Sequence, residues 1–232
     1  RRASREGGEV RSRRRRRMTV STTLESAGPV AQSEVTIKAV PPAADPAPLG
    51  LAGFALTTFL LSIANAHWTK GSATEWLGYA LAYGGGAQLL AGMWEFKNRN
   101  VFGATAFSTY GAFWIGLALY VKLGVTATSN GGNDLGWILV AFFIFNTYML
   151  LWSLFVTKAV LGVFLALEIA LCLLWIGNLW GNVDVVEAGG VAGVVTAAVA
   201  WYASAAGVIN GMAGRHVLFV GKPFAIPGSR RA

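Results

Sequence analysis

The chain has 232 residues, of which 54% are apolar and only 13% are charged. A soluble domain carries roughly 25% charged residues, so this chain could cover a water-exposed globule only sparsely, and its hydrophobicity excludes a disordered protein. The formal net charge is +8, of which residues 1–17 alone contribute +7. The body of the protein is therefore nearly neutral.

Residues 1–17 form a basic tail of nine Arg and two Glu that ends at Met18. The tail has no aromatic residue and the body is nearly neutral, so we expect no nucleic-acid partner. We expect Met18 to be the true start and the tail to be extraneous; the alternative is a genuine basic arm that lies on anionic lipid. Residues 18–47 are rich in Ser, Thr, Ala and Pro, which predicts a flexible cytoplasmic arm and not a signal peptide.

Six apolar runs of 19–23 residues follow, at 48–66, 76–96, 101–121, 135–156, 159–180 and 191–213. About 20 helical residues cross a hydrocarbon core of about 30 Å. The runs are long and continuous, which favours helices over the shorter alternating strands of a barrel. The sequence predicts an all-α integral membrane protein, with a six-helix transmembrane domain over residues 48–214 and a basic cytoplasmic C-terminal tail over residues 215–232.

The basic residues in the breaks between the runs predict the orientation. After Asp45, seven Lys or Arg fall on the side that includes the N-terminus, and two, Lys70 and Lys122, fall on the other. Because cytoplasmic loops carry the excess of Lys and Arg, both termini are expected in the cytoplasm, as in a multi-pass protein of the plasma membrane.

Three stretches have the character of signatures. Residues 45–51 read Asp-Pro-Ala-Pro-Leu-Gly-Leu, where two prolines stiffen the start of the first run and Asp45 can cap it. Residues 83–114 contain Tyr-Gly-Gly-Gly-Ala-Gln, Ala-Gly-Met-Trp-Glu-Phe and Phe-Gly-Ala-Thr-Ala-Phe-Ser-Thr-Tyr-Gly-Ala-Phe-Trp. The glycines allow a neighbouring helix to approach closely, and the absence of a following Lys-Ser/Thr excludes a phosphate loop. A third, weaker stretch is Ile-Gly-Asn at residues 176–178.

These stretches resemble the acetate uptake transporters of the GPR1/FUN34/YaaH family over about residues 45–214. The first signature of many members begins with Asn where this chain has Asp45. The resemblance implies six transmembrane helices and a homo-hexamer in which each subunit has its own pore. It also implies transport of small monocarboxylates, chiefly acetate and in some members succinate, commonly coupled to protons.

The resemblance further implies an apolar gate formed by Phe54, Tyr110 and Leu167. A carboxylate cannot cross hydrocarbon, so its path also needs hydroxyl and amide groups that replace water. The expected substrate pathway comprises Asp45, Leu49, Gly50, Thr58, Ser62, Asn65, Gln88, Thr105, Ser108 and Asn178. Three of these positions form a stripe with Phe54 along the first run at i, i+4, i+8 and i+11, namely Phe54, Thr58, Ser62 and Asn65. The stripe favours pore lining; the alternative is that the hydroxyls bond to carbonyls of their own helix.

Two carboxyl groups stand in or beside apolar runs. Glu168 lies near the middle of the fifth run, where a charge costs at least about 2.5 kcal/mol. It must face protein or water, or stay protonated, which leaves two hypotheses: a proton-linked group beside the pore, or a structural carboxyl bonded to a neighbouring helix or subunit. Glu95 ends the second run near Lys97 and Arg99, which indicates an interfacial salt bridge or cap.

Other functional classes find little support in the sequence. The single cysteine, Cys172, and two histidines, His67 and His216, give neither a disulfide framework nor a metal site. No Ser-His-Asp set, acidic pair or nucleotide motif is present, so we expect no cofactor and no enzyme. Two alternatives stay open: a channel for a small neutral solute such as urea or an amide, and a membrane sensor of acid or ammonium. A sensor would need a sizeable cytoplasmic domain, which the short breaks cannot hold.

Overall fold

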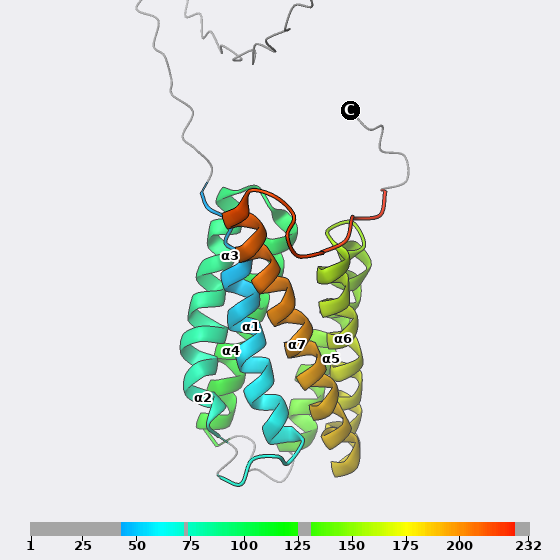
Figure 1. The fold of residues 1–232 in the computed structure, drawn as a ribbon. Coiled ribbons are helices and arrows are strands. Elements are labelled where there is room, and N and C mark those ends of the chain that lie inside the picture. Colours follow the sequence, from blue (N-terminus) through cyan, green and yellow to red (C-terminus); the bar gives the residue numbers. More distant parts are fainter. Residues whose placement is uncertain (1–42, 72–73, 125–130, 226–232) are drawn as a thin grey trace, which may run out of the picture. The chain divides into compact units, whose positions relative to one another are not determined.

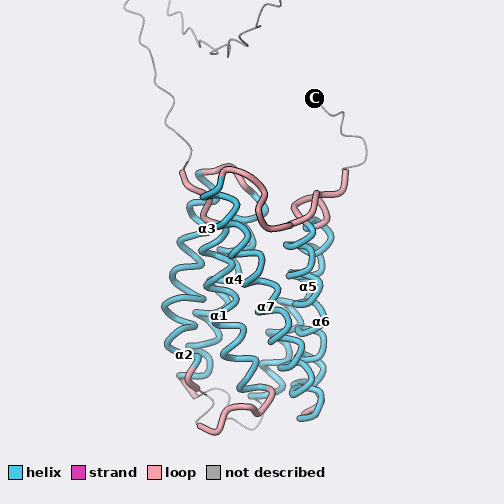
Figure 2. The backbone as a smooth tube through the Cα atoms, viewed as in Figure 1, coloured by secondary structure: helices cyan, strands magenta, loops and turns pink. Residues whose placement is uncertain are grey.

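The computed structural model describes residues 43–71, 74–124 and 131–225. Within these ranges the chain forms helices joined by turns and loops, with no strand (Figures 1 and 2). The expectation of an all-helical fold is therefore confirmed for the described residues. The basic tail at 1–17 and residues 18–42 of the expected arm lie outside them.

Five described helices are long and apolar enough to cross a membrane. They are α1 (Ala47–Asn65), α4 (Val101–Lys122), α5 (Gly131–Ser153), α6 (Lys158–Trp180) and α7 (Val183–Ala213). Between α1 and α4 the chain forms α2 (Trp76–Tyr79), the π-helix η1 (Ala80–Ala87) and α3 (Gln88–Lys97), which follow one another without a loop. This composite segment covers the second apolar run, and its wider π-helical turns include the three consecutive glycines.

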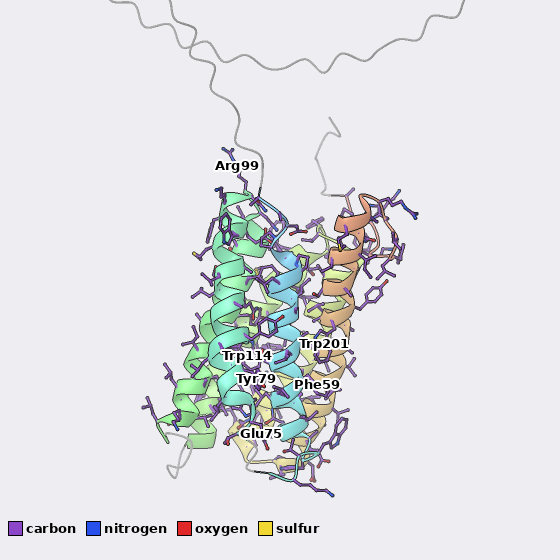
Figure 3. All side chains as sticks on the ribbon, turned by 60° about the vertical axis from the view of Figure 1, so that its left-hand side comes forward. Phe59, Glu75, Tyr79, Arg99, Trp114 and Trp201 are labelled. Carbon is purple, nitrogen blue, oxygen red and sulfur yellow. The ribbon has the colours of Figure 1, made fainter. Side chains whose placement is uncertain are left out.

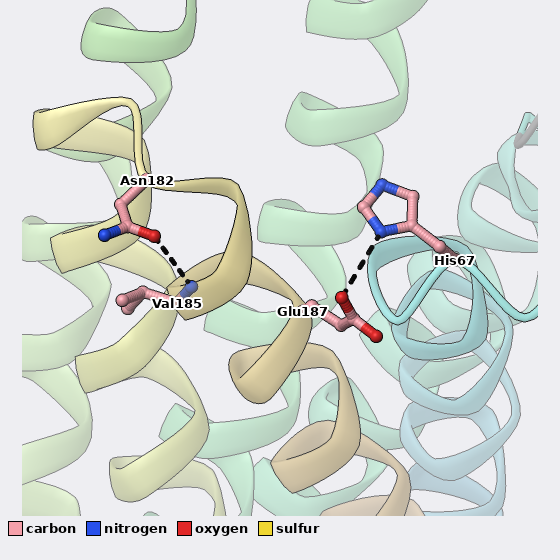
Figure 4. A network of polar contacts seen from close by, with 4 residues as sticks. All are labelled: His67, Asn182, Val185 and Glu187. Carbon is pink, nitrogen blue, oxygen red and sulfur yellow. Dashed lines mark hydrogen bonds and ion pairs between the residues drawn. The ribbon is translucent and has the colours of Figure 1, made fainter.

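The last helix begins earlier than its apolar run predicts. α7 starts at Val183, eight residues before the expected position 191, and its 31 residues extend about 46 Å. The Asn182 side chain caps the helix by accepting a hydrogen bond from the Val185 amide at 3.2 Å (Figure 4). Asp184 in the first turn adds a favourable charge at the positive end of the helix dipole. Hydropathy alone treats these polar residues as a break, although they form the start of the helix.

The described ends of the chain, near residues 43 and 225, lie at the same end of the helical bundle (Figure 1). Arg99 also lies at this end, and Glu75 lies at the opposite one (Figure 3). At the Arg99 end, Asn98 donates a hydrogen bond to the Ala44 carbonyl at 3.4 Å. At the Glu75 end, His67 Nδ1 lies 4.0 Å from Glu187 Oε2 and joins the end of α1 to the start of α7 (Figure 4).

The segment after α7 folds back against the turn between α5 and α6. The Ala159 amide donates to the Val220 carbonyl, and the Phe224 amide donates to the Leu154 carbonyl, both at 2.9 Å. The Asn210 side chain accepts from the amides at 217 and 218 at 2.7 and 2.9 Å. The first residues of the predicted C-terminal tail are thus held by backbone hydrogen bonds to the bundle.

α7 packs along both α1 and α6, α5 packs on α6, and η1 and α3 pack on α1 and α4. Small residues permit the closest crossings: a Cβ on Gly190 of α7 would stand 2.5 Å from the Ala66 backbone nitrogen after α1. The main apolar core lies among α1, α4, α5, α6 and α7 and is rich in aromatic rings. This core contains the site described next.

Candidate functional site

Phe54, Tyr110 and Leu167 come from three different helices, α1, α4 and α6, and meet in one place. All three side chains are buried in the main core. The Phe54 and Tyr110 rings make an edge-on contact, with centroids 5.6 Å apart and planes at 61°. All three residues line the same cavity. The structure therefore brings together the residues that the family resemblance assigns to a gate.

The Tyr110 ring is the centre of an aromatic cluster. Its centroid lies 5.3 Å from that of Phe145, 6.3 Å from that of Phe142 and 6.5 Å from that of Phe164. Edge-to-face and tilted contacts at these distances are the favourable arrangements for aromatic pairs. The ring is thus held on the sides of α5 and α6, while Phe54 approaches it from α1.

The cavity next to this cluster has a volume of about 70 Å³. About 10–15 Å³ of such space is enough for one water molecule, so the cavity has room for a solute of a few non-hydrogen atoms. Its walls are largely aromatic and aliphatic, and its polar lining residues are Gln88, Glu95, Asn100 and Tyr110. The cavity is suited to a small solute with an apolar part.

Glu95 is buried, with 1% of its surface exposed, whereas Lys97 and Arg99 are exposed. Its Oε2 accepts a hydrogen bond from Asn100 Nδ2 at 2.9 Å, and Asn100 Oδ1 caps α4 by accepting from the Gly103 amide at 3.1 Å. The carboxylate therefore supports the cap that joins α3 to α4. Glu95 Oε1 has no hydrogen-bond partner in the described part of the chain, and the same is true of Oε1 of the equally buried Gln88.

A polar network lies behind Tyr110. The Tyr110 hydroxyl donates to Asn146 Oδ1 at 2.8 Å. Asn146 Nδ2 in turn donates to Glu168 Oε2 at 2.5 Å and to the Phe164 carbonyl at 3.0 Å. Thr147 Oγ1 lies 2.6 Å from Glu168 Oε1, so both carboxyl oxygens of Glu168 have a partner on α5. Glu168 is half-buried and does not line the cavity.

Of the ten residues expected along the substrate pathway, Gln88 lines the described cavity and the other nine are absent from its wall. Asp45 is exposed and accepts a hydrogen bond from the Ala47 amide at 3.0 Å, and Leu49 is 46% exposed. Asn178 donates to the carbonyl of Leu174 in its own helix at 2.8 Å.

The remaining six lie inside the bundle. A Cβ on Gly50 would stand 2.6 Å from the Phe107 ring. Thr58 and Ser62 are buried, and Asn65, Thr105 and Ser108 are half-buried. The hydroxyl oxygens of Thr58 and Ser108 are buried and have no hydrogen-bond partner among the described residues.

The sequence analysis did not predict a role for Asn146. It is fully buried and is the hydrogen-bond partner of both Tyr110 and Glu168. The available signal was an amide in the middle of the apolar run 135–156, a position where an unpaired polar group is costly. Among the described residues, no group of three or more His, Cys, Asp or Glu could hold a metal ion.

Comparison with known proteins assigns the chain to a family. The model of the GPR1/FUN34/yaaH family matches residues 29–227. This protein belongs to that family. It is therefore a multi-pass integral membrane protein, as its apolar helices indicate.

Relatives from bacteria and fungi are similar to this protein over most of its length. The chain is 38% identical over 182 residues to the succinate-acetate/proton symporter SatP of Escherichia coli K12, covering 77% of this chain and 96% of the relative. It is 41% identical over 185 residues to acetate permease A of Emericella nidulans, covering 72% of this chain and 62% of the relative. It is 38% identical over 195 residues to ammonia transport outward protein 2 of Saccharomyces cerevisiae, covering 80% and 68%.

A solved structure has the same fold. The structure of the bacterial acetate channel SatP matches with a TM-score of 0.72 and 37% identity, covering 77% of this chain and 99% of the other. The names of these relatives describe transport, so the family-level comparison favours a transporter or channel over an enzyme.

Proposed function

We propose that this protein is a permease or channel that passes small carboxylates, chiefly the monocarboxylate acetate and also the dicarboxylate succinate, across the plasma membrane. The observation that carries the proposal is the small cavity lined by Phe54, Tyr110 and Leu167 in a chain whose relatives include an acetate permease and a succinate-acetate/proton symporter. The aromatic rings pack the methyl end of acetate, and the narrow space between them rejects acids with a wider apolar part.

The proposed fold of one chain is a six-span bundle with both termini in the cytoplasm. Six such chains are proposed to form a homo-hexamer. Five helices qualify as spans, and we assign the sixth to the composite segment α2–η1–α3, whose 22 residues suffice to cross a hydrocarbon core. The described ends of the chain lie at the end of the bundle where Arg99 lies, which supports a cytoplasmic assignment for both (Figures 1 and 3). The hexamer rests on the family resemblance.

The proposed pathway crosses the constriction and continues along hydroxyl and amide groups. Gln88 supplies such a group at the cavity. The buried hydroxyls of Thr58 and Ser108, which have no partner in the described part of the chain, supply others deeper in the bundle. Glu168 is the proposed proton-linked group, because it is a carboxyl in mid-span that is joined to Tyr110 through one residue.

Uptake of labelled acetate into proteoliposomes, with and without an imposed inward proton gradient, tests the function. We expect saturable acetate uptake that succinate inhibits, and accumulation above the external concentration when the gradient is present. A pure channel would equilibrate acetate without accumulating it. Uptake no faster than in protein-free liposomes would rule out the proposal.

Transport of ammonia or another small neutral solute is the second candidate. It is favoured by the 38% identity to a yeast protein named for outward ammonia transport, and by the lack of Lys or Arg in the apolar centres of the predicted spans. A cationic side chain would stabilise a carboxylate in the pore, whereas a neutral solute needs no such partner. Parallel measurements with labelled acetate, methylammonium and urea in the same vesicles decide between the two candidates.

A further inference from the structure

We propose that Asn146 is a positioning residue for selectivity: it holds the Tyr110 hydroxyl on the far side of the constriction, and Glu168 fixes its orientation. The proposal rests on the proposed transport function, because selectivity is the property that it explains. It concerns a residue in the middle of α5 that does not itself line the cavity.

Asn146 joins three helices through one side chain. It is fully buried in α5, accepts from Tyr110 of α4, and donates to Glu168 and to the Phe164 carbonyl of α6. An amide side chain has two donor hydrogens and an acceptor oxygen, so both donors are used. A buried polar group with all these bonds made holds its neighbours in one arrangement, and removing one partner leaves the others unsatisfied.

The orientation of the amide is determined by Glu168. Two acceptors, Glu168 Oε2 and the Phe164 carbonyl oxygen, lie next to Asn146 Nδ2. Turning the amide over would place its oxygen against both of them, so Oδ1 must face Tyr110. The Tyr110 hydroxyl consequently directs its single hydrogen toward α5 and away from the cavity.

This arrangement has a direct consequence for the constriction. The Tyr110 ring packs against Phe142, Phe145 and Phe164. Its hydroxyl is held by the hydrogen bond to Asn146. With the hydroxyl bonded to Asn146, Tyr110 presents its ring and not a donor hydrogen to a passing solute. Loss of the bond frees the ring to move, which admits a larger acid.

A double-mutant cycle tests whether Asn146 acts through Tyr110. Asn146→Leu removes the amide at similar volume, and Tyr110→Phe removes only the hydroxyl. The readout is the ratio of labelled acetate uptake to labelled lactate uptake in proteoliposomes. We expect each single variant to lower the ratio about fivefold, as expected for one lost hydrogen bond, and the double variant to equal either single variant. Multiplied effects in the double variant, or an unchanged ratio in the Asn146→Leu protein, would overturn the proposal.

Exchanging the amide at position 146 with the carboxyl at position 168 should rescue selectivity, which a merely structural role would not predict. Asn146→Asp places two carboxyls in contact, and we expect it to lose selectivity. In the double variant Asn146→Asp with Glu168→Gln, the introduced glutamine amide donates to the introduced aspartate, whose other oxygen accepts from Tyr110. We expect the parental ratio to be partly restored, because the aspartate oxygen that replaces Nδ2 faces the Phe164 carbonyl and cannot donate to it. A double variant as unselective as Asn146→Asp alone would contradict the proposal. This test does not depend on Asn146→Leu, so it still decides the question if that variant does not fold.

Thermal unfolding of the same variants in detergent separates this proposal from the proposed function. The hydrogen bond between Asn146 and Tyr110 predicts non-additive losses in unfolding temperature even if acetate is not the substrate. Additive losses would refute the link whatever the protein transports. The matched control is Thr196→Val in α7, a buried hydroxyl that bonds to the Ala192 carbonyl of its own helix, and it should leave the uptake ratio unchanged.

Discussion

Glu168 shows how a half-buried carboxyl group in the middle of an apolar helix finds hydrogen-bond partners. Asn146 and Thr147 on the facing helix provide a partner for each of its oxygens. The Thr147 hydroxyl also lies 2.9 Å from the Phe143 carbonyl, so it can donate its one hydrogen to either acceptor. This arrangement accommodates a proton on Glu168 Oε1, because Thr147 can then accept from the carboxyl and donate to the carbonyl.

For Glu168→Gln we expect downhill acetate flux to continue and gradient-driven accumulation to be lost. The amide nitrogen of the introduced side chain can face Thr147, so the bond to Asn146 persists while the group no longer ionises. Accumulation and downhill flux are measured side by side in proteoliposomes. Accumulation at the parental level in a well-assembled variant would end the proton-carrier hypothesis and leave Glu168 a structural role.

Phe54→Ala and Tyr110→Ala should each widen the constriction. Both rings are buried against each other, so truncating either one enlarges the cavity. We expect wider monocarboxylates such as benzoate to enter at least about tenfold faster relative to acetate, because a barrier lowered by about 1.4 kcal/mol changes a rate tenfold. Competition of unlabelled acids against labelled acetate measures this. Unchanged selectivity in both variants would show that the constriction lies elsewhere.

At the scale of elements, glycines decide how closely the helices pack. A Cβ on Gly111 of α4 would lie 2.8 Å from the Leu89 backbone nitrogen of α3. This is closer than a Cβ can approach a backbone atom, so a helix would have to shift. A Cβ on Gly116, five residues further along the same helix, would meet nothing within 4 Å. The two positions share a helix but differ in what they face, which makes them a matched pair.

Gly111→Ala should destabilise the protein by about 1–3 kcal/mol through overpacking. Gly116→Ala should be neutral or slightly stabilising, because alanine favours a helix by about 1 kcal/mol over glycine and meets no obstacle here. The apparent unfolding temperature in detergent is the measurement. Equal effects at the two positions would falsify the close packing of α3 on α4.

At the scale of the whole molecule, the two described ends of the chain lie at the same end of the bundle (Figure 1). The segment after α7 is bonded to the turn between α5 and α6, and Val156 and Val160 beside that turn line the cavity. The family model begins its match at residue 29, well after the basic tail. The described residues that line the cavity all lie between positions 47 and 167.

A chain that starts at Met18 should consequently insert and transport acetate at the parental rate. The uptake rate is compared at equal abundance of protein in the membrane, so that a change in expression is not mistaken for a change in activity. Slower transport by the shortened chain at equal abundance would favour the alternative, in which the tail is a functional arm on anionic lipid.

The sequence by itself determined the class of protein, the approximate spans, the predicted sidedness and the signatures, because hydropathy and charge act locally and can be read along one chain. Only the tertiary structure showed that Phe54, Tyr110 and Leu167 meet, that Glu95 is buried beside Asn100, and that Asn146 joins Tyr110 to Glu168. Such contacts join different helices, and they depend on how each helix is rotated and shifted against its neighbours. That register is decided by close packing at positions such as Gly111 and Gly190, where backbones approach within the space of one methyl group, and a single sequence does not reveal which faces will meet.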